Sequence, residues 1–188
     1  MDRKSIFVAP GREAAQRLTS EEEMRLMEKG MRKLYGAKEE IPPDGIALDF
    51  VKAHQKLQRF VCWGTTGEGV TLRRSGGRFN RSTYYQVSVS RNRKYMGHKL
   101  SLCNKLGIGY STLEGTGMET SHLCHRHSCW NPDHLVAEGH KENMGRSTCP
   151  GWLYAVEDDQ LFCLCEHVPH SCKHVHVRRS LRSIEVCG

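Results

Sequence analysis

The sequence predicts a mixed, loop-rich α+β fold, and three changes of pattern along its 188 residues support this. Apolar residues recur at helical spacing in the first sixty residues and then alternate with polar residues as far as residue 102. Residues 103–188 are rich in loops, cysteine and histidine. The length suits one folding unit, which we divide into an N-terminal helical segment (1–60) and a core (61–188).

Two amphipathic helices are expected in the N-terminal segment. The first begins with a capping-box pattern at 20–23, ends at Gly36, and has an apolar face of Met24, Met27, Met31 and Leu34. The second follows the Pro42-Pro43 break and has an apolar face of Ile46, Phe50, Val51 and Leu57. Both faces predict packing in the core or an oligomer contact, and we assign the methionine stripe to the core.

Antiparallel strands are expected between residues 59 and 102. Val70 and Leu72 precede a turn at 75–77, and Tyr85, Val87 and Val89 follow it with the alternation of a half-buried strand. Residues 73–99 include eight Lys or Arg and no acidic residue. This sheet therefore presents a surface of one charge sign.

The charge of the chain predicts a polyanionic partner. Lys plus Arg number 28 against 21 Asp plus Glu, which gives a formal charge of +7. A two- or three-stranded sheet fits the major groove of DNA, where Arg and Gln read base edges and Ser and Lys hold phosphates. The candidate DNA contacts are Arg73, Arg74, Arg78, Gln86, Ser88, Arg91, Arg93 and Lys94. The alternative is a solvated sheet face without a ligand.

Residues 121–135, SHLCHRHSCWNPDHL, predict a structural zinc site. Cys124, Cys129 and His134 stand around an Asn-Pro turn dipeptide, and structural zinc takes four Cys or His ligands in a tetrahedron. The fourth ligand would be Cys62, with Cys103 as the second choice.

A second zinc site is expected from Cys149, Cys165, His167 and Cys172, with Cys163, His170, His174 and His176 as spare candidates. Nine cysteines interleaved with histidines favour metal over disulfides and therefore a reducing compartment. We expect no signal peptide and no membrane partner, since no stretch is apolar enough. Two zinc sites would add folding free energy to a chain with only 38% hydrophobic residues.

His122 is required by neither zinc site, so it is a candidate for chemistry. A short helix expected at EGHKENMGR would present Asn143, whose amide oxygen suits Mg²⁺. A neutral imidazole beside hydrated Mg²⁺ could take a proton from water while the metal stabilises charge on a phosphate. A packing histidine is the alternative for His122, and His125 and His127 are expected to face solvent or phosphate.

The order of these residues resembles the His-Cys box homing endonucleases, the intron-encoded nucleases of the ββα-metal, or His-Me finger, superfamily. The similarity is close over residues 121–151, which include Asn143, the Gly-Arg pair after it and Cys-Pro-Gly at 149–151. It stays ordered as far as Cys172, and the N-terminal helices fall outside it.

The resemblance implies that His122 is the general base, that Asn143 is the protein ligand of one catalytic Mg²⁺, and that Arg81 contacts the scissile phosphate. Arg78 and Arg91 are the alternatives for that arginine. It also implies two structural zinc ions per chain, an antiparallel sheet on DNA, and a homodimer that cuts both strands of a near-palindromic site. We therefore expect a site-specific, Mg²⁺-dependent double-strand DNA homing endonuclease with a ββα-metal motif.

Two other functions and one location complete these expectations. A zinc-stabilised DNA-binding protein without cleavage would have no reason to keep His122 and Asn143 together, and both are present. A non-specific nuclease of the same superfamily would cut unrelated DNAs equally. Because the chain resembles nucleases encoded in nuclear ribosomal introns, the expected location is the nucleus.

Overall fold

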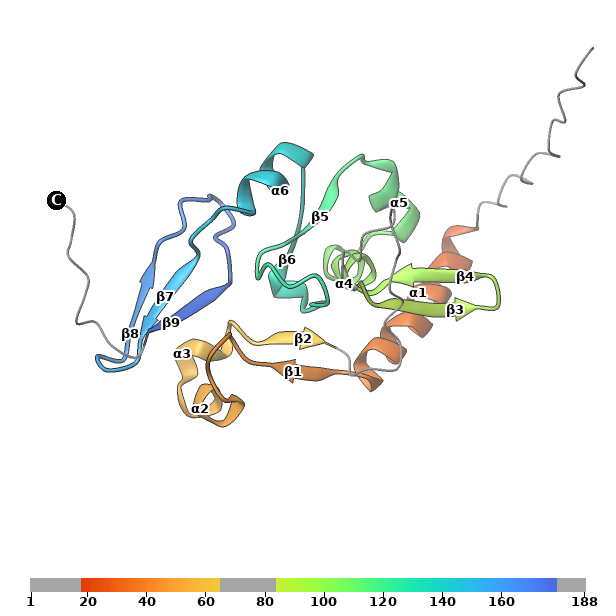
Figure 1. Cartoon of the computed structure of the whole chain (residues 1–188). Coiled ribbons are helices and arrows are strands. Elements are labelled where there is room, and N and C mark those ends of the chain that lie inside the picture. The colour runs from red at the N-terminus through yellow and green to blue at the C-terminus, as the bar shows by residue number, and fades with distance from the viewer. Residues whose placement is uncertain (1–17, 65–83, 179–188) are drawn as a thin grey trace, which may run out of the picture.

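The computed structural model describes residues 18–64 and 84–178, and within these ranges the fold is α+β, as predicted (Figure 1). Its helices are α1 (Ser20–Gly36), α2 (Leu48–Ala53), α3 (Gln55–Gln58), α4 (Gly97–Leu106), α5 (Tyr110–Gly115), the 3₁₀ helix η1 (Pro132–His134) and α6 (His140–Arg146). Its strands are β1 (Glu39–Ile41), β2 (Cys62–Gly64), β3 (Gln86–Ser90), β4 (Arg93–Met96), β5 (Glu119–His122), β6 (Leu135–Glu138), β7 (Trp152–Ala155), β8 (Gln160–Cys163) and β9 (Val175–Arg178).

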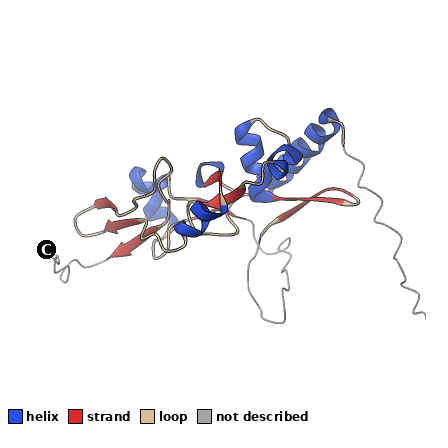
Figure 2. Ribbon diagram, turned by 90° about the horizontal axis from the view of Figure 1, so that it is seen from above, coloured by secondary structure: helices blue, strands red, loops and turns tan. Residues whose placement is uncertain are grey.

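The strands form small separate sheets. β1 pairs with β2, β3 with β4 and β5 with β6, all antiparallel, while β7 lies between antiparallel β8 and parallel β9. The molecule is elongated, with α1, β3 and β4 at one end and β7, β8 and β9 at the other (Figure 1). Seen from above, helices and loops separate the sheets along its length (Figure 2). Among the described residues, no helix combines the length and the apolar character that crossing a bilayer requires.

Helix α1 forms as predicted, with one correction to its buried face. Thr19 caps it by accepting from the backbone N–H of Glu22. Met27, Met31 and Leu34 are buried, but Met24 is 52% exposed, so its assignment to the core is wrong. The buried face passes through Glu23 instead, one turn before Met27.

Glu23 is buried because it caps a second helix. Its carboxylate accepts from the backbone N–H of Ser111 at 2.8 Å and from the Ser111 hydroxyl at 3.0 Å, in the first turn of α5. The N-cap residue of α5, Gly109, offers no side chain for this purpose. A carboxylate from a distant helix therefore satisfies donors that α5 leaves free.

The second predicted helix is broken in two. His54 leaves the helical conformation, with φ −110° and ψ 89°, between α2 and α3. Val51 and Leu57 are nevertheless buried in one cluster with Phe60, Tyr154 and Val175. These N-terminal helices therefore support the β7–β9 sheet. The division at residue 60 stays a prediction.

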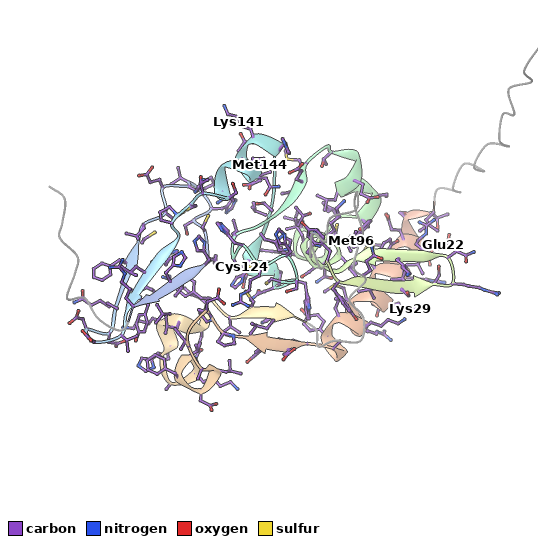
Figure 3. The ribbon with its side chains drawn as sticks, viewed as in Figure 1. Glu22, Lys29, Met96, Cys124, Lys141 and Met144 are labelled. Carbon is purple, nitrogen blue, oxygen red and sulfur yellow. The ribbon has the colours of Figure 1, made fainter. Side chains whose placement is uncertain are left out.

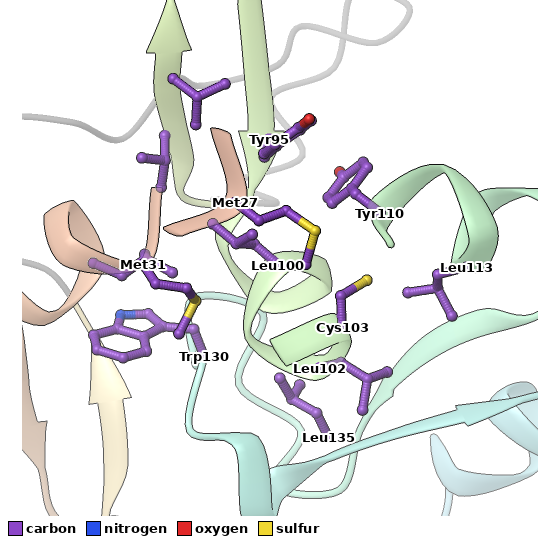
Figure 4. Packing of buried hydrophobic residues seen from close by; sticks show 13 residues of the cluster. Met27, Met31, Tyr95, Leu100, Leu102, Cys103, Tyr110, Leu113, Trp130 and Leu135 are labelled. Atoms are coloured by element: carbon purple, nitrogen blue, oxygen red, sulfur yellow. The ribbon is translucent and has the colours of Figure 1, made fainter. Parts of the chain in front are cut away.

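The larger core lies between α1, the β3–β4 hairpin and α4 (Figure 4). Val87 and Val89 face it from β3, as predicted. Trp130, from the loop between β5 and β6, packs against it and has no exposed surface. Gly30 allows α1 to approach closely, because a Cβ there would lie 2.6 Å from the Leu100 side chain. This core includes Cys103 as an ordinary apolar member.

The hairpin differs from the predicted one. β3 pairs with β4 across a turn at Arg91-Asn92, with a register shift between Ser88 and Ser90. The predicted partner strand containing Val70 and Leu72, and its turn at 75–77, lie outside the described residues.

We predict that Glu23→Ala lowers the free energy of unfolding by about 1–3 kcal/mol, because the Ser111 donors lose their buried acceptor. Glu22→Ala, an exposed neighbour on the same turn, should change it by less than about 0.5 kcal/mol. Urea unfolding followed by circular dichroism measures both. Equal effects of the two variants would contradict the capping role of Glu23.

Candidate metal centres and active site

The first predicted zinc site is assembled in the structure. Cys62 from β2, Cys124 and Cys129 from the β5–β6 loop, and His134 from η1 are all buried, with one ligand atom each within 4.8 Å of the others. Zinc with bonds of about 2.3 Å to sulfur and about 2.1 Å to nitrogen separates those two ligand atoms by about 3.6 Å in a tetrahedron. The sulfurs of Cys62 and Cys129 lie 3.6 and 3.7 Å from His134 Nδ1. The spacing therefore fits zinc.

Hydrogen bonds outside the cluster orient its histidine and its loop. His134 Nε2 lies 2.8 Å from the Arg59 carbonyl oxygen, so it carries the proton and leaves the Nδ1 lone pair for the metal. Asn131 accepts from the Asp133 backbone N–H and donates to the Val61 carbonyl at 2.9 Å. The predicted Asn-Pro turn thereby joins the loop to the segment that leads into β2.

The three thiols of this cluster cannot all keep ordinary proton affinities. Hydrogen bonds with Cys124 and Cys129, together with burial, raise the pKa of the Cys62 thiol. Hydrogen bonds with Cys124 and Cys62 lower the pKa of Cys129 despite its burial. A divalent cation that replaces the shared protons allows all three sulfurs to be thiolates at once. Cys103, the second choice, lies elsewhere, in the core of α1 and α4, where burial raises its pKa to about 12.

The second predicted zinc site is also assembled. Cys149 follows α6, and Cys165, His167 and Cys172 lie between β8 and β9. His167 Nδ1 is 3.6 Å from the Cys165 sulfur and 3.9 Å from the Cys172 sulfur. Burial opposes ionisation of Cys165, but hydrogen bonds from the backbone of Cys172 and His167 lower its pKa to about 6. Among the spare candidates, Cys163 is exposed and outside the cluster.

Arg146 joins this second cluster to the β5–β6 unit. Its guanidinium bonds both carboxylate oxygens of Glu138 at 2.7 and 2.8 Å, and Nη1 lies 3.6 Å from the Cys172 sulfur. Nη1 also donates to the His170 carbonyl at 2.6 Å. Arg146 is 5% exposed, so it is a buried bridge between α6, β6 and the metal loop. Sequence reasoning assigned no role to Arg146 or to Glu138.

His122 ends β5 and is held by the first metal loop. Its Nε2 lies 3.1 Å from the carbonyl oxygen of Cys129, so Nε2 carries the proton and Nδ1 keeps a lone pair. The side chain is 9% exposed. Burial lowers the pKa of His122 to about 4, which keeps the imidazole neutral near pH 7.

Three rings surround His122, and sequence reasoning assigned no role to two of them, Tyr84 and His98. The ring centroids of His98, Tyr84 and His127 lie 4.9, 5.9 and 6.1 Å from that of His122. The Tyr84 hydroxyl bonds His127 Nδ1 at 3.3 Å. His127 is exposed, as expected, but His125 packs its ring on His174, at a centroid distance of 4.0 Å, so its expected solvent-facing place is wrong.

Lys141 and Met144 of α6 are exposed, and Lys141 points away from the body of the molecule (Figure 3), whereas Asn143 is half-buried. Its Oδ1 accepts from the Ser121 hydroxyl at 2.8 Å, and its Nδ2 donates to Glu119 at 2.5 Å. Hydrogen bonds from Asn143 and His140 lower the pKa of the Glu119 carboxyl. Since Ser121 immediately precedes His122, the predicted base and the predicted Mg²⁺ ligand meet at one strand, although no hydrogen bond joins their side chains.

The DNA-contact candidates are placed only in part. Ser88 and Lys94 are cross-strand partners and are exposed, and Gln86 lies on the same outer face. Arg91 is exposed in the turn and Arg93 is half-buried beside it. The remaining basic candidates lie outside the described residues: Arg73, Arg74, Arg78 and the catalytic candidate Arg81.

We predict that Cys124→Ala loses one zinc ion per chain relative to wild type and most of the cooperative unfolding transition, since ligand loss removes metal-coupled folding free energy. Cys103→Ala, a matched change of a buried thiol outside both clusters, should retain all bound zinc. Elemental analysis and thermal unfolding measure this. Full zinc content in Cys124→Ala would contradict the first site.

A comparison with known protein families agrees with this geometry. A family profile described as the zinc-binding loop region of homing endonuclease matches residues 62–183. The match begins at Cys62 and includes every ligand of the two Cys₃His clusters. The resemblance noted in the sequence is thereby confirmed, and the chain belongs to this homing endonuclease family.

Proposed function

We propose that this protein is a site-specific homing endonuclease that hydrolyses both strands of DNA with Mg²⁺. Its family supports a nuclease or DNA-binding role. The observation that carries the proposal of hydrolysis is the hydrogen bond between His122 Nε2 and the Cys129 carbonyl. It fixes the tautomer in which Nδ1 is a free base, as general base catalysis requires.

In the proposed reaction, His122 Nδ1 takes a proton from a water molecule. The water oxygen forms a bond to phosphorus as the opposite P–O3′ bond breaks, and the leaving O3′ takes a proton from solvent. The products are a 5′ phosphate and a 3′ hydroxyl. Bound Mg²⁺ would stabilise the charge on the phosphate and on the leaving oxygen.

The residues around Asn143 fit a Mg²⁺ site. Mg²⁺ prefers oxygen ligands, and the Asn143 Oδ1 of α6 lies beside the Glu119 carboxylate of β5. Oδ1 accepts one hydrogen bond, from Ser121, and keeps a second lone pair for a metal. We assign Asn143 as the Mg²⁺ ligand and Glu119 as the residue that orients its amide. By accepting from Nδ2, Glu119 leaves Oδ1 as the oxygen that can face the metal.

The placement of His122 and Ser121 on one strand suggests where the scissile phosphate binds. Consecutive strand residues point to opposite faces, so His122 lies on one face of β5, and Ser121, with its partner Asn143, lies on the other. A phosphate that reaches both His122 and Asn143 therefore lies across the edge of β5. β6 occupies the other edge of β5. Tyr84 belongs to the same region. Burial raises the pKa of its hydroxyl, and the nearby negative charge of Glu119 raises this pKa further.

The β3–β4 hairpin is the proposed DNA-docking element. Gln86, Ser88 and Lys94 lie on its outer face, with Arg91 and Arg93 at its turn. Lys33 of α1 adds a positive charge beside it, since its Nζ donates to the Ser88 carbonyl at 2.7 Å. Arg73, Arg74 and Arg78 are proposed DNA contacts too, and Arg81 is proposed to contact the scissile phosphate.

The proposed active unit is a homodimer. Each described chain carries a single His122–Asn143 pair, and cleavage of both strands at one site requires two such pairs. A second copy related by two-fold symmetry supplies the other and matches a near-palindromic target. The proposed location is the nucleus.

We predict that His122→Ala lowers the single-turnover cleavage rate by about 10²–10⁴-fold, because it removes the general base. Zinc content and DNA affinity should stay at wild-type values. His54→Ala, a histidine at the junction of α2 and α3, should cleave normally. Tight DNA binding with no cleavage by wild type at any Mg²⁺ concentration would identify the protein as a DNA-binding protein without nuclease activity.

We predict that Lys94→Ala weakens DNA binding about equally for target and unrelated sequences and reduces the slope of log K against log salt by about 0.9. Lys52→Ala, an exposed lysine on α2, should leave both unchanged. Fluorescence anisotropy over a salt series measures this. An unchanged slope in Lys94→Ala would exclude Lys94 as a phosphate contact.

A further inference from the structure

A third group of potential metal ligands adjoins the second Cys₃His cluster. His125, Cys172 and His174 each offer a ligand atom within 4.8 Å of the other two. Cys172 belongs to both groups, whereas the two histidines belong to neither zinc centre. His125 comes from the β5–β6 loop and His174 from the segment before β9, so the group joins the two metal loops.

Both histidines carry a buried ring nitrogen without a hydrogen-bond partner among the described residues. These atoms are His125 Nε2 and His174 Nδ1. An unpaired buried polar atom is destabilising, and native structures usually satisfy it with a partner from the protein, a water molecule or an ion. Two imidazoles that each hold an unpaired nitrogen, together with one cysteine sulfur, form a donor set suited to zinc.

The surroundings of His174 leave Nδ1 free for a metal. Nδ1 is buried and has no hydrogen-bond partner among the described residues. The ring packs against the backbone at Gly151. Gly151 permits this contact, since a Cβ there would lie 2.5 Å from the His174 ring.

The backbone holds His125 in a fixed position opposite His174. His125 has φ +57°, in the left-handed region that is strained for most residues other than glycine. Its N–H donates to the His122 carbonyl at 3.0 Å, which closes the turn after β5. The strained turn places the two rings 4.0 Å apart between centroids.

The local charge also permits a further cation. Three thiolates and a neutral histidine around one Zn²⁺ carry a net charge of −1. The Arg146 charge near Cys172 is balanced by its pair with Glu138. We propose that His125 and His174 bind a third zinc ion, which shares the Cys172 thiolate with the second Cys₃His centre. Water or His176, whose ring lies 5.1 Å from that of His174, completes its coordination.

Zinc stoichiometry tests this proposal independently of DNA cleavage. Wild type dialysed against excess zinc and then buffer should contain three zinc ions per chain, and the double variant His125→Asn/His174→Gln should contain two. Asn is chosen at 125 because it tolerates positive φ. His54→Gln, a histidine outside every cluster, should keep three.

Two zinc ions in both wild type and the double variant would overturn the proposal and leave a buried water as the partner of these nitrogens. If the double variant does not fold, cadmium-substituted wild type gives the answer by NMR. Three cadmium signals, two of them coupled through a shared thiolate, are expected. Two uncoupled signals would equally overturn the proposal.

Discussion

The structure depends on the Cys₃His cluster that closes the loop between β5 and β6 and whose geometry fits zinc. This loop contributes Cys124 and Cys129 and leads into His134, and it begins at the end of β5, the strand that carries His122. The carbonyl of Cys129 holds His122 by its Nε2, so the position of the candidate base follows from the position of a zinc ligand. The loop contains too few apolar residues for a hydrophobic core of its own to hold it in place of the Cys₃His cluster.

The second cluster has the same relation to α6. This helix has only seven residues, which is too short for stability in isolation. Arg146 fixes its C-terminal end between Glu138 and Cys172, and Cys149 follows three residues later. Asn143, one turn before Arg146, is thereby held against β5. The two Cys₃His clusters thus fix the two sides of one small candidate active-site unit. The apolar core of α1, α4 and the β3–β4 hairpin packs beside this unit.

The parts that the sequence predicts well are those with local signatures. Both ligand sets, the short helix with Asn143 and the alternation of Val87 and Val89 depend on spacing along the chain, and they occur as predicted. What the sequence could not predict depends on contacts between distant segments. Glu23 is buried to serve Ser111, which is 88 residues away, while Met24 beside it is exposed. Glu119, Tyr84 and His98 join the site only because β5, the segment before β3 and α4 come together there. A lone histidine, tyrosine or glutamate has no motif to mark it.

Hydrogen exchange before and after complete zinc removal tests the dependence on metal most directly. We expect the backbone amides of β5, β6 and α6 to lose their protection in the zinc-free protein, while those of α1 and α4 retain theirs. Undiminished protection of β5 and α6 without zinc would contradict the account, because the active-site unit would then be held by packing alone.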